Sequence, residues 1–205
     1  ARAQRRGDGA TVAEEGPRAG DIEEGFVERE GFDQRRHARE NRVELLARGD
    51  VGVEARPHYH RVGREAERLG FTAYFVGGVV RDMLLKQPSS DWDIVVEGDA
   101  IELAKVIAAQ NKAKVTAYEQ FGTATLTFVD GLVMDFATAR SESYPQPGAL
   151  PVVKSGSIKE DLFRRDFTVN ALAVILNPQN FGELQDFYGG LIDLKKRKVH
   201  VLHDK

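Results

Sequence analysis

The segment from residue 73 to residue 137 most constrains what this chain can fold into, because strand-like and helix-like patterns alternate along it. Apolar runs rich in β-branched and aromatic residues predict strands over Ala73–Val76, Asp91–Val96, Thr123–Phe128 and Leu132–Ala137. Helical spacing predicts helices over residues 79–85 and 100–110. Asp130 and Gly131 favour a two-residue hairpin turn between the last two strands. We therefore expect an α/β fold with a small mixed β-sheet flanked by helices.

Further elements are predicted on both sides of this segment. Apolar spacing from Arg61 indicates a helix that stops at Gly70. Ser157 and Glu160 have the spacing of a capping box, which predicts the start of another helix. Two more strands are expected, over Leu172–Leu176 and Lys198–Leu202. The proline- and glycine-rich stretch Tyr144–Pro151 is expected to be a loop.

The N-terminal part of the chain has a different composition. Residues 1–70 contain 14 of the 19 arginines and no lysine. Dense mixed charge with few large apolar residues cannot offset the ordering entropy of a core. We expect an N-terminal extension or linker over residues 1–60, with a short helix near Arg39–Arg48, and one folded domain over residues 61–205. His58 and His60 are expected at the surface, because no third metal ligand lies near them in sequence.

Composition also excludes several classes of protein. The chain has no cysteine, which removes disulfides, thiolate metal sites and cysteine nucleophiles. No apolar run approaches the roughly 20 residues of a membrane helix. The formal net charge of −3 argues against wholesale coating of nucleic acid but does not exclude a local basic patch. We expect a cytoplasmic protein without membrane contact.

Asp91 and Asp93 form the first chemically informative cluster. Side chains two residues apart in a strand project from the same face, so both carboxylates are expected to point one way. Converging carboxylates suit two magnesium ions. Asp135 supplies a third carboxylate if its strand lies beside that of Asp93. The alternative is a solvent-exposed strand end without a metal.

Gly77 and Gly78 form the second cluster, between a predicted strand and a predicted helix. A glycine pair lets backbone N–H groups approach a phosphate closely, and Arg81 one turn later can reach the same anion. A simple tight turn is the alternative.

Arg164 and Arg165 form the third cluster, next to Asp166 and among apolar residues. An arginine held by Asp166 would make a rigid contact to phosphate or ribose, whereas a structural ion pair at a helix end is the alternative. Arg140 and Glu142 present a weaker version of the same choice.

Taken together, four sequence stretches resemble one family. GGVVRD, DWD, DFATARSESYPQPGALP and SIKEDLFRRDFTVNALA resemble the catalytic head of class II tRNA nucleotidyltransferases and bacterial poly(A) polymerases. The resemblance covers about residues 62–203, and VVEGDAIELA and FGELQDFYGGLIDL look closest to the long bacterial forms. It implies a nucleotidyltransferase-superfamily head.

The resemblance also implies roles for individual residues. Asp91 and Asp93 would hold two Mg²⁺ ions, with Asp135 as a further catalytic carboxylate. The implied nucleotide-binding residues are Gly77, Gly78, Arg81, Arg165, Asp166 and Asn170, with support from Asp82, Arg140, Glu142 and Arg164. The implied reaction is attack of a tRNA 3′-hydroxyl on the α-phosphate of ATP or CTP.

The sequence leaves the product and the assembly open. The family's base-selecting segment and tRNA-binding helical domains would follow Lys205, so we expect this chain to be one part of a longer protein. A CCA-, CC- or A-adding enzyme is the first hypothesis, a poly(A) polymerase the second, and a non-catalytic nucleotide-binding or RNA-binding module the third. The sequence does not predict an oligomeric state.

Overall fold

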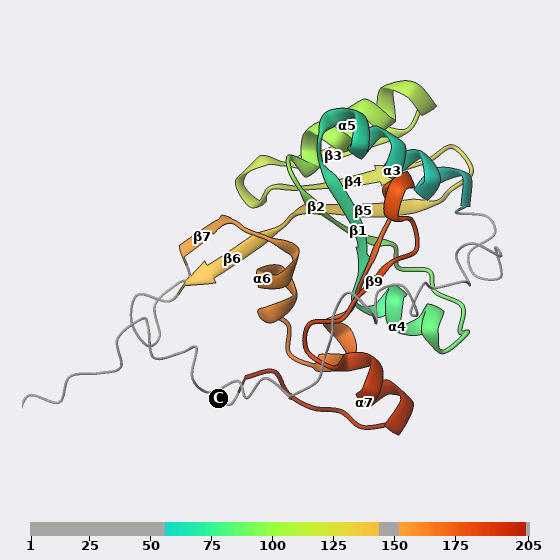
Figure 1. Cartoon of the computed structure of the whole chain (residues 1–205). Coiled ribbons are helices and arrows are strands. Elements are labelled where there is room, and N and C mark those ends of the chain that lie inside the picture. The colour runs from blue at the N-terminus through green and yellow to red at the C-terminus, as the bar shows by residue number, and fades with distance from the viewer. Residues whose placement is uncertain (1–55, 144–151, 204–205) are drawn as a thin grey trace, which may run out of the picture. The chain divides into compact units, whose positions relative to one another are not determined.

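A mixed β-sheet with helices on both faces organises the part of the chain that the structure describes. The computed structural model describes residues 56–143 and 152–203 (Figure 1). The strands of the main sheet are β1 (Thr72–Val76), β2 (Asp93–Glu97), β3 (Lys114–Tyr118), β4 (Thr123–Thr127), β5 (Val133–Thr138), β8 (Ala173–Ile175) and β9 (Leu184–Gln185). A separate hairpin pairs β6 (Arg140–Ser143) with β7 (Val152–Ser155).

Helices connect these strands. The α-helices are α3 (Arg56–Leu69), α4 (Gly78–Leu84), α5 (Ala100–Asn111), α6 (Ile158–Phe163) and α7 (Gly190–Lys196). Short 3₁₀ turns are η1 (Glu119–Phe121), η2 (Thr168–Asn170) and η3 (Pro178–Asn180). None of the helices in these described ranges is long and apolar enough to cross a membrane.

The order of strands decides which residues become neighbours. The main sheet has seven strands in the order β3-β4-β5-β2-β1-β8-β9. Strands β2 and β5 run parallel, whereas the other neighbouring pairs are antiparallel. The expected mixed α/β sheet is therefore confirmed, and β2 lies between β1 and β5 at its centre.

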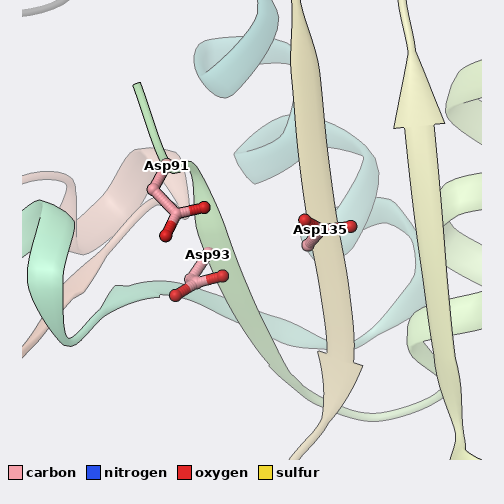
Figure 2. A group of neighbouring side chains, drawn as sticks. All are labelled: Asp91, Asp93 and Asp135. Atoms are coloured by element: carbon pink, nitrogen blue, oxygen red, sulfur yellow. The ribbon is translucent and has the colours of Figure 1, made fainter. Parts of the chain in front are cut away.

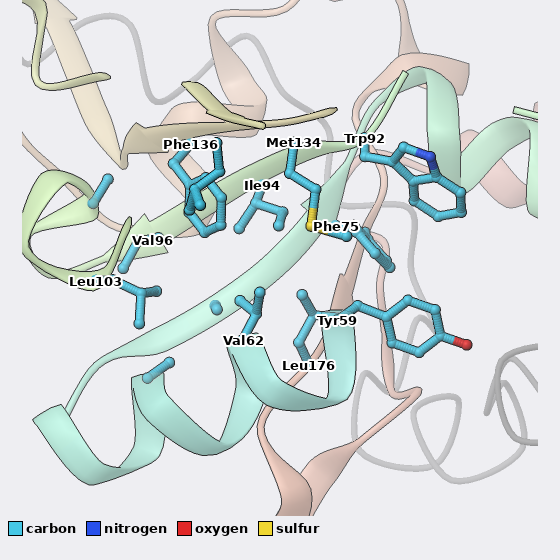
Figure 3. Close-up of a cluster of buried hydrophobic side chains, with 14 of the residues drawn as sticks. Tyr59, Val62, Phe75, Trp92, Ile94, Val96, Leu103, Met134, Phe136 and Leu176 are labelled. Atoms are coloured by element: carbon cyan, nitrogen blue, oxygen red, sulfur yellow. The ribbon is translucent and has the colours of Figure 1, made fainter. Parts of the chain in front are cut away.

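Two apolar layers fix the sheet between its helices. Helices α3 and α5 cover one face, where Phe75, Ile94 and Phe136 are at most 1% exposed (Figure 3). On the other face, α6 packs over β1, β2 and β8, and its buried Leu162 belongs to the same apolar cluster as Val95. Alternating side chains along β1 and β2 thus enter different cores, which fixes the register of both strands.

Local sequence features start the helices as expected. The Asp99 side chain accepts hydrogen bonds from the backbone N–H groups of Ile101 and Glu102, both at 2.9 Å, which caps α5. Ser157 and Glu160 form the predicted capping box at α6, since each side chain accepts from the other's backbone N–H. These caps satisfy donors that a helix start leaves unpaired.

Several sequence expectations need correction. The hairpin loop is longer than two residues, because Phe128 donates its N–H to the carbonyl of Leu132 across three intervening residues. His58 and His60 are half-buried rather than at the surface, since they lie on α3 near aromatic rings of the core. Residues 198–202 form only an isolated bridge at Val201, whose side chain is 56% exposed.

Other differences concern where elements begin. Helix α3 starts at Arg56, five residues before the expected start at Arg61. Strand β3 was missed by the sequence patterns, because its alternation of exposed and half-buried residues lacks a strong apolar signal. The expected helix over Arg39–Arg48 and the loop over Tyr144–Pro151 lie outside the described residues.

Candidate active site

Three aspartates meet at the centre of the sheet (Figure 2). Asp93 begins β2 and is the register partner of Asp135 on the parallel strand β5. Asp91 lies just before β2, so the predicted strand begins two residues later than expected. One carboxylate oxygen from each of the three lies within 4.8 Å of the others. Among the described residues, this is the one cluster of three that could hold a metal ion.

The surroundings of these carboxylates concentrate negative charge. Burial raises the pKa of Asp93, and the nearby charges of Asp91 and Asp135 raise it further, whereas Arg165 opposes the rise. Thr125 on β4 donates its hydroxyl hydrogen bond to Asp135 at 2.6 Å. Hard carboxylate oxygens that converge in this way form a donor set suited to Mg²⁺, because the cation would relieve their mutual repulsion.

The glycine turn lies between β1 and α4. Gly77 has φ of 73° and ψ of −127°, a conformation available essentially only to glycine. A Cβ on Gly77 would lie 2.7 Å from Nη1 of Arg165, so the missing side chain lets this arginine cross the turn. The turn, α4 and the arginine therefore converge from segments far apart in sequence.

Arg81 is oriented by neighbours on two elements. Its Nη1 donates to Oδ1 of Asn170 at 2.7 Å, and its Nε donates to Oδ1 of Asp82 at 2.9 Å. Its Nη2 lies 3.7 Å from the position of a Cβ on Gly78. Asn170, which the family resemblance implied to be a nucleotide-binding residue, thus orders Arg81.

Asp161 holds both arginines of the third cluster. Its side chain is fully buried, and Oδ1 accepts from Arg164 at 3.0 Å and 3.2 Å while Oδ2 lies 3.5 Å from Nη2 of Arg165. Asp166, the partner expected from sequence, has an exposed side chain. The correction has a simple geometric reason: residues three and four positions apart share a helix face, whereas adjacent residues do not.

Arg140 and Glu142 belong to this ionic network. Arg140 pairs with Glu142 at 3.1 Å, and Arg164 lies 3.7 Å from the same carboxylate. The backbone N–H of Arg140 also donates to Asp161 at 3.3 Å. The network therefore ties the segment after β5 to α6.

The side chain of Arg165 is largely desolvated. Burial lowers its pKa, while Asp161 acts in the opposite direction, as does the more distant Asp93. Two residues at the site went unnoticed in the sequence, Asp161 and Thr125. The spacing of Asp161 from the two arginines could have revealed it, whereas Thr125 becomes a partner of Asp135 only through strand pairing.

A mixed sheet that brings an acidic triad beside a glycine turn and two arginines defines a nucleotidyltransferase head. The Poly A polymerase head domain family matches residues 73–200. This chain belongs to that family.

Relatives and solved structures agree with this assignment. The chain is 53% identical over 131 residues to an A-adding tRNA nucleotidyltransferase of Aquifex aeolicus, covering 64% of this chain and 16% of that protein. It is 44% identical to a CC-adding tRNA nucleotidyltransferase of Deinococcus radiodurans, over 63% of this chain and 35% of the relative.

Among solved structures, a Thermotoga maritima CCA-adding enzyme complexed with tRNA aligns with a TM-score of 0.69 and 39% identity, over 78% of this chain and 36% of that one. A CCA-adding enzyme in its apo form II aligns with a TM-score of 0.74 and 41% identity, over 78% and 38% of the two chains. The chain spans between 16% and 36% of the length of the curated relatives it matches.

Proposed function

We propose that this chain is the catalytic head of a template-independent RNA nucleotidyltransferase that adds A, C or both to the 3′ end of tRNA and releases pyrophosphate. The convergence of Asp91, Asp93 and Asp135 beside the Gly77 turn is the observation that carries the proposal. Relatives with A-adding, CC-adding and CCA-adding names match the same part of the chain, which supports tRNA as the substrate.

Magnesium is the metal that the donor set fits. Asp91 and Asp93 would hold two ions, with Asp135 as a further carboxylate beside them. Bound Mg²⁺ would lower the pKa of the attacking 3′-hydroxyl and neutralise charge on the leaving pyrophosphate. Thr125 keeps the carboxylate of Asp135 in one orientation through its 2.6 Å hydrogen bond.

The arginines and the glycine turn would bind the triphosphate of ATP or CTP. Arg81 is fixed by Asn170 and Asp82, and its Nη2 lies 3.7 Å from the position of a Cβ on Gly78, so the guanidinium is held beside the turn. Arg165 is fixed from behind by Asp161 and crosses Gly77. Preorganised cations of this kind stabilise charge without reorganising during the reaction. We propose that Gly78 lets the phosphates approach the backbone.

The test is nucleotide addition by the full-length gene product. Labelled ATP and CTP are offered with Mg²⁺ to tRNAs that end before CCA, after C or after CC. Products of one to three nucleotides support tRNA end repair, whereas long A tails identify a poly(A) polymerase instead. No product with any primer would favour a binding module and contradict the proposal.

Two variants test the metal assignment. Asp91→Ala and Asp93→Ala are each expected to abolish addition while the protein remains folded, because each loses a carboxylate that no neighbour replaces. Near-normal turnover by either variant, in preparations free of wild-type enzyme, would contradict the assignment. We also propose that the N-terminal extension ends where α3 begins at Arg56, because Tyr59 on that helix is buried in the head's core, and that the protein is cytoplasmic.

A further inference from the structure

Asp193 on α7 is a buried carboxylate outside the site described so far. The residue is 3% exposed, and a carboxylate removed from water needs polar partners to stabilise its charge. Its Oδ2 accepts the hydroxyl hydrogen bond of Thr168 at 2.7 Å and lies 2.8 Å from Nδ1 of His200. Thr168 belongs to η2 and is also buried, at 6% exposed. The carboxylate of Asp193 therefore joins α7, η2 and the segment that follows α7.

Backbone contacts hold the same segments together. The N–H of Thr168 donates to the carbonyl oxygen of His200 at 3.0 Å. Gly190 at the start of α7 lies directly against η2, because a Cβ on this glycine would clash with the carbonyl oxygen of Thr168. Thr168 is thus held through its hydroxyl, its N–H and its carbonyl side at once.

η2 in turn contacts the groups proposed to bind phosphate. Asn170 ends η2, and its Oδ1 accepts from Nη1 of Arg81 at 2.7 Å. Leu172, two residues later, accepts the backbone N–H of Gly77 at 3.0 Å. Thr168 and Asn170 lie within one turn of a 3₁₀ helix, so a displacement of the first moves the second. A continuous series of contacts therefore leads from Asp193 through η2 to the guanidinium of Arg81.

We propose that Asp193 is a positioning residue for nucleotide binding: it holds η2 so that Asn170 keeps Arg81 in place for the triphosphate. This inference rests on the proposed function, because the triphosphate of ATP or CTP is the ligand proposed for Arg81. A hydrogen bond to an ionised acceptor is roughly twice as strong as a neutral one, which suits a contact that must stay fixed. Asp193 acts through other residues and takes no part in the chemistry.

Steady-state kinetics of the full-length gene product test the inference. Asp193→Asn removes the charge and Thr168→Val removes the hydroxyl. Each should raise the KM for ATP about tenfold and lower kcat less, because a displaced Arg81 weakens binding of the phosphates. The KM for the tRNA primer should stay unchanged. Thr168→Ser keeps the hydroxyl and should restore a KM close to that of the wild type.

Thr138→Val is the matched control for Thr168→Val. The Thr138 hydroxyl accepts from the backbone N–H of Ala100 at 3.2 Å, at the start of α5, which covers the opposite face of the sheet from α6. The control also loses one threonine hydrogen bond, so it should lower the melting temperature while the KM for ATP stays unchanged. An equal rise of KM in both variants would indicate a general loss of stability and overturn the proposal.

A double-mutant cycle tests whether Asp193 acts through Arg81. In an Arg81→Met background, Asp193→Asn should change the KM for ATP less than about twofold, because the group that it positions is already absent. A full tenfold effect in that background would overturn the proposal. His200→Ala keeps the measurement possible if the buried variants do not fold, since its side chain is 49% exposed. It should raise the KM about two- to threefold, and an unchanged KM would then count against the proposal.

Equilibrium binding of ATP separates this inference from the proposed function. Calorimetry with ATP and Mg²⁺, without primer, requires no turnover. A tenfold higher Kd for Asp193→Asn, with no nucleotide addition by the wild type, would support the positioning role and contradict the proposed function. Nucleotide addition by the wild type, with equal KM and Kd in the variant, would overturn the positioning role and leave the proposed function standing. No measurable ATP binding by the wild type would overturn both.

Discussion

Replacing Gly77 by alanine tests the link between backbone conformation and nucleotide binding. The new methyl group would lie 2.7 Å from Nη1 of Arg165, closer than real Cβ contacts, so the arginine must shift. The backbone also has φ of 73° and ψ of −127°, which costs an L-residue about 1–3 kcal/mol. The variant should therefore lose both stability and correct placement of Arg165.

The expected size of the activity loss follows from the contact. Removal of one preorganised donor costs about 10²–10³ in rate, and Arg165 is displaced rather than removed. We expect kcat/KM for ATP to fall about 10- to 100-fold, equivalent to about 1.4–2.8 kcal/mol. The assay is single-nucleotide addition by the full-length gene product at saturating primer, with ATP varied.

Gly70→Ala provides the matched control. Gly70 also has positive φ, at 75°, but a Cβ there meets nothing within 4 Å. The control should lose about 1–2 kcal/mol of unfolding free energy, and its kcat/KM should be unchanged. Each kcal/mol lost lowers the melting temperature by about 2–4 °C. If Gly77→Ala lowered only the melting temperature and kept wild-type kcat/KM, the assigned role of Arg165 at the turn would be refuted.

Three further substitutions test the framework of the site. Asp161→Asn removes the charge behind Arg165 and should raise the KM for ATP about tenfold, more than it lowers kcat, in the same assay. Gly63→Ala places a methyl group 1.8 Å from the backbone oxygen of Leu176 and should destabilise the fold by about 3 kcal/mol or more in urea denaturation. An unchanged denaturation midpoint would contradict that contact. Hydrogen bonds from the serine that caps α6 lower the pKa of Glu160, so its stabilisation is present above the ordinary pKa of 4.5 and is lost as the pH falls through the lowered value. Glu160→Ala should cost about 0.5–1 kcal/mol near pH 7, with a difference from wild type that shrinks below pH 4.5 in thermal melts.

Local patterns in the sequence predicted most of the elements around the site. The glycine pair, the hairpin strands and the capping box all appear where the sequence indicated them, because each depends on residues within a few positions of one another. Strand β3 escaped prediction, since an edge strand with one open face has little apolar signal. The prediction of a strand over residues 198–202 was wrong for the opposite reason: the composition is typical of a strand, but within the described ranges the segment pairs only through one isolated bridge.

The sequence by itself determined the chemistry present in the site: paired aspartates two residues apart, a glycine turn and adjacent arginines. The tertiary structure decided how these groups combine. It set Asp135 beside Asp93 through a parallel pairing and placed Asp161 within ion-pair distance of both arginines. These outcomes depend on strand order and on helix faces that meet across many residues of sequence, and no local pattern specifies such long-range contacts.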